Sequence, residues 1–308
     1  MAGDDEVVYE RSMVAGKLPA GSPSGIALPG RPGLLVVVGT PIGNLGDLSP
    51  RAVQALERAD VIACEDTRRT RQLLSHAGIR GAAFTSLYAH NEAAKAPALV
   101  EQMASGATVA IVSDAGMPAI SDPGSLLIRA AIDAGIRVTA VPGPSAALSA
   151  LIVSGFDTSR FVFEGFLPRK GPERRRQLAL LAVETRTAVL FESARRVGDT
   201  LKDLCQICGR ERRVAVAREL TKVHEEIWRA DLASLCCTVD ELTQLGELVI
   251  VLEGAPPQTP GAPDDSDVGA MMARLLQQGA STKEAAAAVA AALGVPRRRA
   301  YELAPKVL

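Results

Sequence analysis

Charged side chains recur in this sequence directly after short apolar runs, where they could bind the polar groups of a ligand. The run at residues 61–64 leads into residues 65–71, which hold two carboxylates and three arginines. Because the arginine fork matches phosphate geometry, this segment indicates a phosphate-binding site. A salt-bridged turn would have the same composition, and the residue types alone do not separate the two interpretations.

The second half of the chain repeats this pattern. Apolar runs at residues 188–191 and 213–217 each end in a mixture of acidic and basic side chains, which core packing does not require. Residues 169–176 carry five positive charges, a density typical of a solvated helix start or of a contact with an RNA backbone. His90 stands in a loop after the strand-like residues 83–87, and a single loop histidine is weak evidence for chemistry.

The densest group of Gly, Pro and Asp lies in residues 113–124, after the branched apolar run 109–112. Such a run predicts a buried parallel strand. We expect Asp122 to cap the following helix, with Pro123 at its first position. Because ligands of open α/β sheets bind in loops at the carboxyl ends of strands, this loop is the first candidate for a ligand site.

Two similar loops follow the predicted strands 34–38 and 138–141. The first, residues 39–47, lacks the glycine spacing of the dinucleotide fingerprint, and it holds no Walker lysine. The second, residues 142–146, leads into another helix. Short strands alternate with helices from residue 34 to about residue 153, which predicts βαβ units and a parallel sheet with these loops on one rim.

Composition limits the possible functions. The 308 residues suffice for two domains, and the apolar fraction of 47% allows a sizeable core. Aromatic residues make up 3%, which argues against a large base-stacking platform, and the net charge of −1 restricts nucleic-acid binding to local basic clusters. No apolar run approaches the roughly 20 residues of a membrane span, and no secretory signal is recognisable. We expect a cytoplasmic protein.

The five cysteines form no disulfide-like framework and fit a reducing compartment. Cys205 and Cys208 have C-x-x-C spacing, and Cys236 and Cys237 are adjacent. A zinc site needs a second spaced pair, whereas Leu201, Leu204 and Cys208 share one helical face, so buried thiols are the preferred interpretation.

Five segments are expected along the chain. Residues 1–32 are predicted to be a disordered tail, 33–147 an N-terminal α/β domain, 148–254 a C-terminal α/β domain, 255–267 a linker and 268–308 a helical domain. The last segment reads as three short helices at 268–278, 282–293 and 296–304. Arginines that open the third helix indicate either a helix-turn-helix that contacts nucleic acid or a small helical cap with exposed charges.

Several motifs occur together and in order, and their combination is far more specific than any single one. The motifs are VVGTPIGNLGD (37–47), ACEDTRRT (63–70), HNE (90–92), VSDAGMPAISDPG (112–124), VPGPSA (141–146), GFLPRKG (165–171), FESARR (191–196) and RELTKVHEE (218–226). With these motifs in this order, the sequence resembles the tetrapyrrole methylase superfamily over residues 34–254, and within it the branch that acts on ribosomal RNA.

The resemblance implies a two-domain α/β methyltransferase of class III, with a mostly parallel N-terminal sheet, a mixed C-terminal sheet and a small C-terminal helical domain. It also implies a homodimer that binds S-adenosylmethionine between the domains without a metal. The implied activity is 2′-O-methylation of a cytidine ribose in the decoding region of 16S rRNA. By position, the residues implied to contact the cofactor are Pro41, Ser113, Asp114, Ala115, Ile120, Pro142, Gly143, Leu167 and Ala217.

The sequence departs from the tetrapyrrole-modifying members, which carry a G-x-G-x-G-D loop where this chain has residues 39–44. The departure argues against a porphyrin or corrin substrate, and the arginine-rich motifs favour one that carries phosphate. Two alternatives stay open: a methyltransferase of the same fold that acts on a small molecule or a modified protein residue, and a non-catalytic RNA-binding protein.

A ribose hydroxyl is a poor nucleophile until it loses its proton, so a base or a cation that stabilises the alkoxide should assist the transfer. Our candidates are His90, Glu192 and Lys222, because they stand at or near strand ends. The residues expected to contact substrate RNA are Arg68, Arg195, Arg196, Arg218, Arg297 and Arg298.

Overall fold

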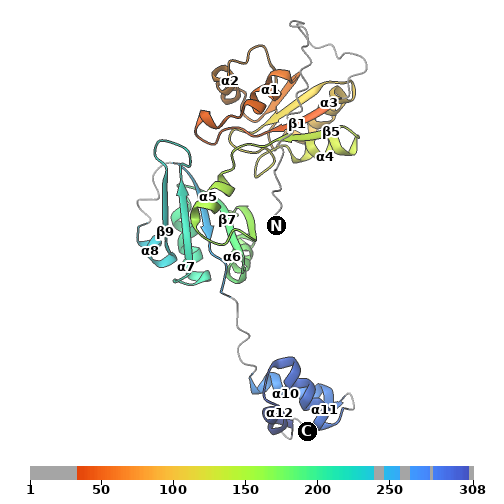
Figure 1. Cartoon of the computed structure of the whole chain (residues 1–308), viewed down its shortest axis with the longest axis vertical. Coiled ribbons are helices and arrows are strands. Elements are labelled where there is room, and N and C mark those ends of the chain that lie inside the picture. Colours follow the sequence, from red (N-terminus) through yellow and green to blue (C-terminus); the bar gives the residue numbers. More distant parts are fainter. Residues whose placement is uncertain (1–32, 239–245, 257–263, 278–279, 305–308) are drawn as a thin grey trace, which may run out of the picture. The chain divides into compact units, whose positions relative to one another are not determined.

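The computed structural model describes residues 33–238, 246–256, 264–277 and 280–304. The predicted tail at 1–32 and residues 257–263 of the predicted linker lie outside the described residues. The chain divides into two compact units, one made of residues 1–40 and 48–143 and the other of residues 41–47 and 144–308. Figure 1 shows both units in colours that follow the sequence.

The first unit is built on a five-stranded sheet of order β3-β2-β4-β1-β5, and every neighbouring pair is parallel. All its strands are short. The neighbouring inner strands β4 and β1 are apolar along nearly their whole length, as expected for a sheet covered on both faces. The strands are β1 (Leu34–Val38), β2 (Val61–Cys64), β3 (Ala83–Ser86), β4 (Thr108–Val112) and β5 (Arg137–Val141).

Helices cover both faces of this sheet. On one face α1 and α2 pack against β1, β2 and β4 through Leu56 and Leu74, and on the other α3 and α4 pack through Met103 and Leu127. Helix α1 is capped locally, because the side chain of Ser49 accepts a hydrogen bond from the N–H of Ala52. The helices are α1 (Pro50–Arg58), α2 (Thr67–His76), α3 (Glu92–Ala104) and α4 (Ser125–Asp133).

The second unit contains a five-stranded mixed sheet of order β6-β7-β10-β8-β9, in which only β6 and β7 run parallel. Helices α6, α7 and α8 pack on one face, and α5 contacts strands β7 to β10. The α/β fold class, with a parallel first sheet and a mixed second one, is thus confirmed. The elements are α5 (Ala146–Ser154), β6 (Phe161–Phe166), α6 (Pro172–Val183), β7 (Thr187–Ser193), α7 (Val197–Cys208), β8 (Arg213–Arg218), β9 (Glu226–Asp231), α8 (Leu232–Cys237), β10 (Glu247–Leu252) and the short 3-10 helix η1 (Leu45–Asp47).

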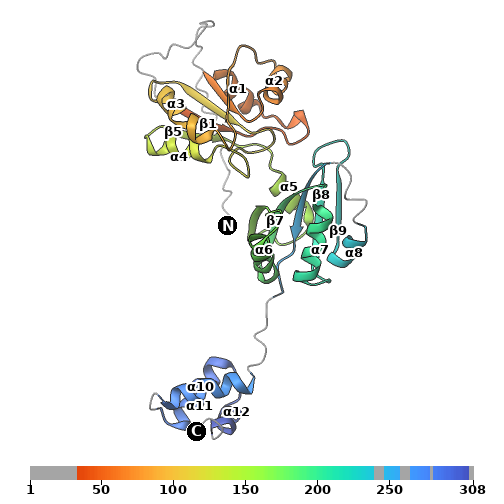
Figure 2. The same ribbon diagram turned by 180° about the vertical axis from the view of Figure 1, so that it is seen from behind.

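Three helices follow at the C-terminus, and they bury a small core of their own around Met272, Val289 and Leu303. They are α10 (Asp265–Gln277), α11 (Thr282–Leu293) and α12 (Arg297–Leu303), and Figure 2 shows them packed on one another. The predicted start of α11 is confirmed as a capping box in which Ser281 and Glu284 bond reciprocally. No helix in the described ranges is long and apolar enough to span a membrane.

The predicted start of α4 is wrong. The helix begins at Ser125, two residues after Pro123, and its N-cap is Gly124 with φ of 130°. A glycine has no side chain to cap the helix, and the cap comes instead from the carboxylate of Glu92, far away in the sequence.

Candidate functional site

Three loops of the first unit meet at one edge of the parallel sheet. Strands β4, β1 and β5 are neighbours, so the loops after Val112, Val38 and Val141 leave the same rim. The backbones of two loops approach closely, because a Cβ placed on Gly143 would lie 2.7 Å from the Cα of Gly39. Only glycine fits at this contact, which explains the small residues at both positions.

Main-chain hydrogen bonds join the β1 and β4 loops. Thr40 and Gly116 exchange two N–H to carbonyl bonds of 2.9 and 3.1 Å. The buried hydroxyl of Thr40 donates to the carbonyl of Ser113 at 3.2 Å, and the hydroxyl of Ser113 donates to the carbonyl of Ala115 at 3.2 Å. The predicted cofactor residues Ser113 and Ala115 therefore lie in a loop whose shape is fixed before any ligand binds.

Asp114 connects this loop to the acidic and basic segment after β2. Its carboxylate accepts a hydrogen bond from the N–H of Asp66 at 3.1 Å and lies 3.5 Å from the guanidinium of Arg69. Asp66 in turn caps α2 and pairs with Arg68 at 3.2 Å. Arg68 keeps 86% of its side chain exposed, so it remains available to an external phosphate.

The outer part of the rim is open. Ile120 is 47% exposed, and Pro142 is also exposed. No hydrogen-bond partner is found for the main chain of Ile120 among the described residues. An exposed apolar side chain beside a free N–H and a free carbonyl can bind a flat heterocycle through its face and its edge.

The segment 90–92 turns out to be mainly structural. Asn91 accepts from the N–H of Tyr88 at 2.8 Å and donates to the carbonyl of Ser86 at 3.2 Å, which shapes the turn. Glu92 is 3% exposed and bonds to two N–H groups at the start of α4. His90 is exposed beside them, and it stays a candidate for proton transfer.

A second group of charged residues gathers at one end of the mixed sheet. Leu248 of β10 pairs with Glu192 of β7 on one side and with Arg218 of β8 on the other. Both charged side chains therefore point to the same face of the sheet, as side chains opposite one another in a ladder do. The prediction of a polar strand end is confirmed at this place.

Arg218 is the most unusual member of this group, because it is 8% exposed and only partly paired. One terminal nitrogen lies 2.7 Å from a carboxylate oxygen of Glu226, and the guanidinium lies 5.7 Å from the ring centre of Trp228. Its Nε and Nη1 are buried without a hydrogen-bond partner in the described part of the chain. Buried donors left unpaired are costly, which makes the Arg218 guanidinium a candidate for binding an acceptor from outside the chain, such as a water or a ligand oxygen.

The turn after Arg218 is strained. Glu219 and Thr221 both have positive φ, 52° and 66°, which residues other than glycine rarely adopt. The buried hydroxyl of Thr221 also lacks a partner in the described ranges. Such strain persists where the surrounding structure maintains it, and it is concentrated at functional sites. Sequence reasoning missed Thr221, because nothing in the sequence indicates that a threonine will adopt a positive φ.

Lys222 in the same turn is held as a cation. Its ammonium lies 2.9 Å from Glu219 and 3.5 Å from Glu247. Burial alone would lower the pKa of Lys222, but the hydrogen bond and the charges of these two carboxylates raise it above its ordinary value. Gly43 belongs to the same compact unit as Lys222, and it has no room for a side chain, because a Cβ would lie 2.4 Å from the Cγ of Lys222.

Glu192, one of the predicted catalytic candidates, is buried. It is 3% exposed, and one oxygen accepts from the hydroxyl of Thr200 at 2.7 Å while the other lies 3.4 Å from Arg196. Arg196 itself donates to the carbonyl of Leu167 at 2.7 Å. With both oxygens occupied, Glu192 fits the role of holding Arg196 better than that of a proton acceptor. Arg195 is exposed.

The two remaining predicted cofactor residues of the mixed-sheet unit are buried. Leu167 follows β6 and packs among α6 and α7, and Ala217 lies within β8 on the opposite face of the sheet. Each is 2% exposed, so only their main chains could contact a ligand. Pro41, at the start of the β1 loop, is also buried.

The arginines that open α12 differ in their pairing. Arg299 bonds to Asp265 of α10 at 3.0 Å, and Arg298 lies 3.2 Å from Glu302 with 89% of its side chain exposed. Arg297 is exposed as well. The predicted contacts Arg297 and Arg298 thus face solvent, whereas Arg299 ties two helices together.

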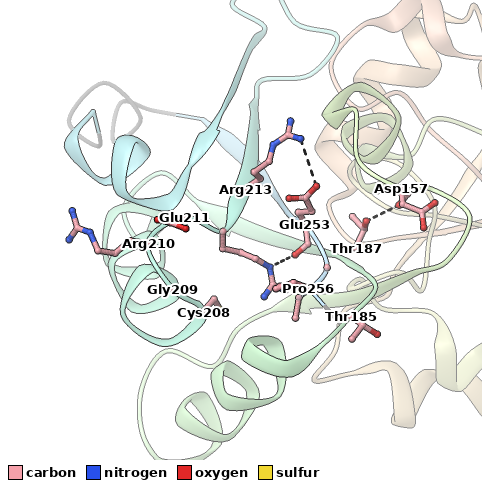
Figure 3. Close-up of a pocket in the computed structure, with 13 residues that line it drawn as sticks. Asp157, Thr185, Thr187, Cys208, Gly209, Arg210, Glu211, Arg213, Glu253 and Pro256 are labelled. Atoms are coloured by element: carbon pink, nitrogen blue, oxygen red, sulfur yellow. Dashed lines mark hydrogen bonds and ion pairs between the residues drawn. The ribbon is translucent and has the colours of Figure 1, made fainter. Parts of the chain in front are cut away.

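A cavity of about 920 Å³ lies at the opposite end of the mixed sheet, between the ends of β8 and β10. Figure 3 shows Arg213 directed toward Glu253 across it. Buried Arg212 donates to the carbonyls of Glu184 and Glu253, so its donors already serve the fold. Basic and acidic residues balance in the lining, and the described residues there hold no group that needs a ligand.

The interpretation as buried thiols is confirmed only in part, because Cys205, Cys208 and Cys236 are partly buried and Cys237 is exposed. Cys205, Cys208 and Cys236 lie against the main core of the mixed-sheet unit. Burial raises the pKa of the Cys208 thiol, and burial together with Cys205 raises the pKa of Cys236 to about 11.

The two-sheet fold and the loops at the edge of the parallel sheet are accompanied by a match to a known protein family. Residues 34–236 match the family described as Tetrapyrrole (Corrin/Porphyrin) Methylases, which is two thirds of the chain. The chain therefore belongs to the tetrapyrrole methylase family, and it is a methyltransferase. The C-terminal residues 262–305 match a further family, the RsmI C-terminal HTH domain.

Curated relatives of high similarity share one name. A protein of Xylella fastidiosa (strain Temecula1 / ATCC 700964), named ribosomal RNA small subunit methyltransferase I, is 47% identical over 272 residues, which cover 88% of this chain and 98% of the relative. Proteins of the same name from Synechocystis sp. and Escherichia coli O157:H7 are 42% and 43% identical, each matching 88% of this chain and covering 97% and 94% of the relatives.

Solved structures share the fold at much lower identity. Uroporphyrin-III-C-methyltransferase from Thermus thermophilus aligns with a TM-score of 0.52 at 21% identity, over 71% of this chain and 94% of that structure. A cobalt precorrin-4 methyltransferase of cobalamin biosynthesis aligns with a TM-score of 0.54 at 17% identity, over 71% and 94%.

Proposed function

We propose that this chain transfers a methyl group from S-adenosylmethionine to ribosomal RNA of the small subunit, and that the acceptor is the ribose 2′-hydroxyl of a cytidine in the decoding region. The names of relatives at 42–47% identity support the RNA substrate. The choice of ribose and of cytidine rests on the resemblance of the motifs.

The loops at the parallel rim fit this cofactor. S-adenosylmethionine presents a flat adenine, and the free main chain of exposed Ile120 provides a donor and an acceptor for its edge. The fixed turn at Ser113 and the close approach of Gly39 and Gly143 provide backbone rather than bulky side chains. When bound, the cofactor supplies an activated sulfonium methyl group.

The residues of this chain would then have to position the ribose and remove its proton. Accurate placement of the reacting atoms can supply much of the rate. Lys222 is a cation held by two carboxylates, so it is suited to stabilise a developing alkoxide rather than to accept a proton. His90 is the remaining candidate for the base, and it is exposed.

The observation that carries the proposal is the incomplete pairing of Arg218. Two of its buried donors have no acceptor among the described residues, and a phosphodiester would offer two oxygens in the geometry that a guanidinium prefers. The exposed arginines Arg68, Arg195, Arg297 and Arg298 would add contacts to the RNA backbone.

A homodimer belongs to the same proposal, as does a cytoplasmic location where ribosomal subunits are found. Strand β6 is an edge of the mixed sheet and carries Phe161, Phe163 and Phe166, which are 36–52% exposed. The last two contact the ring of Phe191. An exposed aromatic group on a sheet edge supports association with a second copy.

The class of acceptor can be tested by label transfer. The protein is incubated with methyl-labelled S-adenosylmethionine and either small ribosomal subunits from cells that lack it or uroporphyrinogen III. We expect label in the RNA and none in the tetrapyrrole. We also expect Arg218→Gln to abolish the labelling of RNA while S-adenosylmethionine still binds. Label in the tetrapyrrole alone would contradict the proposal.

A further inference from the structure

Helix α4 is capped by a residue from a distant part of the chain. One carboxylate oxygen of Glu92 accepts hydrogen bonds from the N–H groups of Gly124 and Leu127, both at 3.0 Å. These are the N-cap residue and the third residue of α4, whose N–H groups have no partner within the helix. Glu92, the first residue of α3, thus caps the N-terminus of α4, as a side chain at the N-cap position ordinarily would.

The N-cap residue of α4 has no side chain with which to cap the helix. A Cβ on Gly124 would lie 2.6 Å from the Cδ1 of Ile111, and residues other than glycine rarely adopt a φ of 130°. Glu92 is 3% exposed, and its negative charge lies where the dipole of α4 is positive. The capping interaction is therefore buried and favourable.

The loop that ends at this cap is strained. Ala119 and Ser121 both have positive φ, 66° and 63°, although neither is a glycine. The near end of the loop is fixed by the bonds between Thr40 and Gly116. The far end is fixed by Glu92, so the strained residues, with Ile120 between them, are held from both sides.

We propose that Glu92 is a positioning residue for the cofactor loop: by anchoring Gly124 and Leu127 it holds Ile120 in the conformation that binds S-adenosylmethionine. The proposal rests on the proposed function, because it takes this loop as the cofactor site. Without the carboxylate, the loop relaxes toward ordinary φ values, and binding must restore the strained form.

Three variants of the full chain test this. Glu92→Ala removes the acceptor, and we expect the dissociation constant for S-adenosylmethionine, measured by titration calorimetry, to rise about tenfold or more. Glu92→Gln keeps an acceptor oxygen and loses the charge, so we expect it to stay within about threefold of the parent protein. Glu101→Ala removes an exposed carboxylate from the same helix, and it should leave the affinity unchanged.

Hydrogen exchange supplies a readout that needs no ligand. Protection of the Gly124 and Leu127 amides should fall in Glu92→Ala and persist in Glu92→Gln. Leu99→Ala, which creates a cavity in the core beneath α3, controls for general destabilisation. It should lower the melting temperature and leave the affinity for S-adenosylmethionine unchanged.

The outcomes separate the two claims. If the parent protein does not bind S-adenosylmethionine, the proposed function fails and the loop is no cofactor site, so the positioning claim falls with it whatever the exchange result. If the parent binds and Glu92→Ala binds equally well, only the positioning role is overturned. That role is overturned as well if Leu99→Ala weakens binding as much as Glu92→Ala does.

Discussion

The carboxylate of Asp114 accepts a hydrogen bond from the main-chain N–H of Asp66 at 3.1 Å, and this bond joins the loops that follow β4 and β2. The two residues are 48 positions apart, and each belongs to a motif that the sequence indicates separately. The structure thus brings the small-residue loop and the arginine-rich segment to one rim, which supports a site that binds a cofactor beside a phosphate.

Two substitutions of Asp114 should distinguish the contribution of its hydrogen bond to stability from the contribution of its charge. Asp114→Asn keeps an acceptor for Asp66 and loses only the pair with Arg69, whose side chain is 64% exposed, so stability should change little. Asp114→Ala leaves the N–H of Asp66 unpaired and should cost about 1–2 kcal/mol of unfolding free energy. Urea denaturation measures both, and equal losses would show that the hydrogen bond is unimportant.

Arg218→Met should separate activity from stability. An apolar side chain of similar length removes the unpaired donors, so unfolding free energy should stay within about 1 kcal/mol of the parent or rise. Methyl transfer to RNA should fall by about a hundredfold or more, because two charge-assisted hydrogen bonds are lost. Arg213→Met, at the other end of the same strand, is the matched control and should remain active. Full activity of Arg218→Met would remove Arg218 from the RNA site.

Gly143→Ala tests the close approach of the β1 and β5 loops. The added methyl group would lie 2.7 Å from Gly39 Cα, so the loops must separate at a cost of about 1–3 kcal/mol. Gly135→Ala is a control with open space around its Cβ and φ of 72°, and it should cost about 1–2 kcal/mol through backbone strain alone. Only Gly143→Ala should weaken S-adenosylmethionine binding, and equal affinities would contradict the cofactor site.

The Glu184–Arg186 pair should produce a pH-dependent part of stability. Hydrogen bonds from the Arg186 side chain and main chain lower the pKa of Glu184 from 4.5 to about 2. Because the folded pKa lies below the ordinary value, the carboxylate stabilises the fold fully above pH 4.5 and progressively less as the pH falls toward 2. The difference in unfolding free energy between the parent and Glu184→Gln should therefore shrink from about pH 5 to about pH 3. A constant difference across that range would show that the pair does not stabilise the fold.

Much of the fold follows from local patterns in the sequence. The apolar run that becomes β4 is buried along its whole length, and the helix predicted at 282–293 is α11 with the same bounds. Short buried strands that alternate with capped helices leave few arrangements other than a parallel sheet. The rim loops follow directly, since ligand-binding loops leave the carboxyl ends of such strands.

The details of the site depend on tertiary contacts that no local pattern contains. The sequence favours Asp122 as the cap of α4, but the cap is Glu92, which the chain brings in from another helix. Glu192 stands at a strand end as predicted, yet Thr200 and Arg196 occupy its oxygens. The unpaired donors of Arg218 among the described residues are a property of packing and are visible only in three dimensions.

The central claim is that the methyl group reaches a ribose oxygen of small-subunit RNA. The direct measurement is to methylate small subunits from cells lacking this protein, digest the RNA with nucleases and identify the modified nucleoside by mass spectrometry. We predict one added methyl group on the ribose of a cytidine in the decoding region. A methyl group on a base, or on a nucleotide outside that region, would contradict the claim.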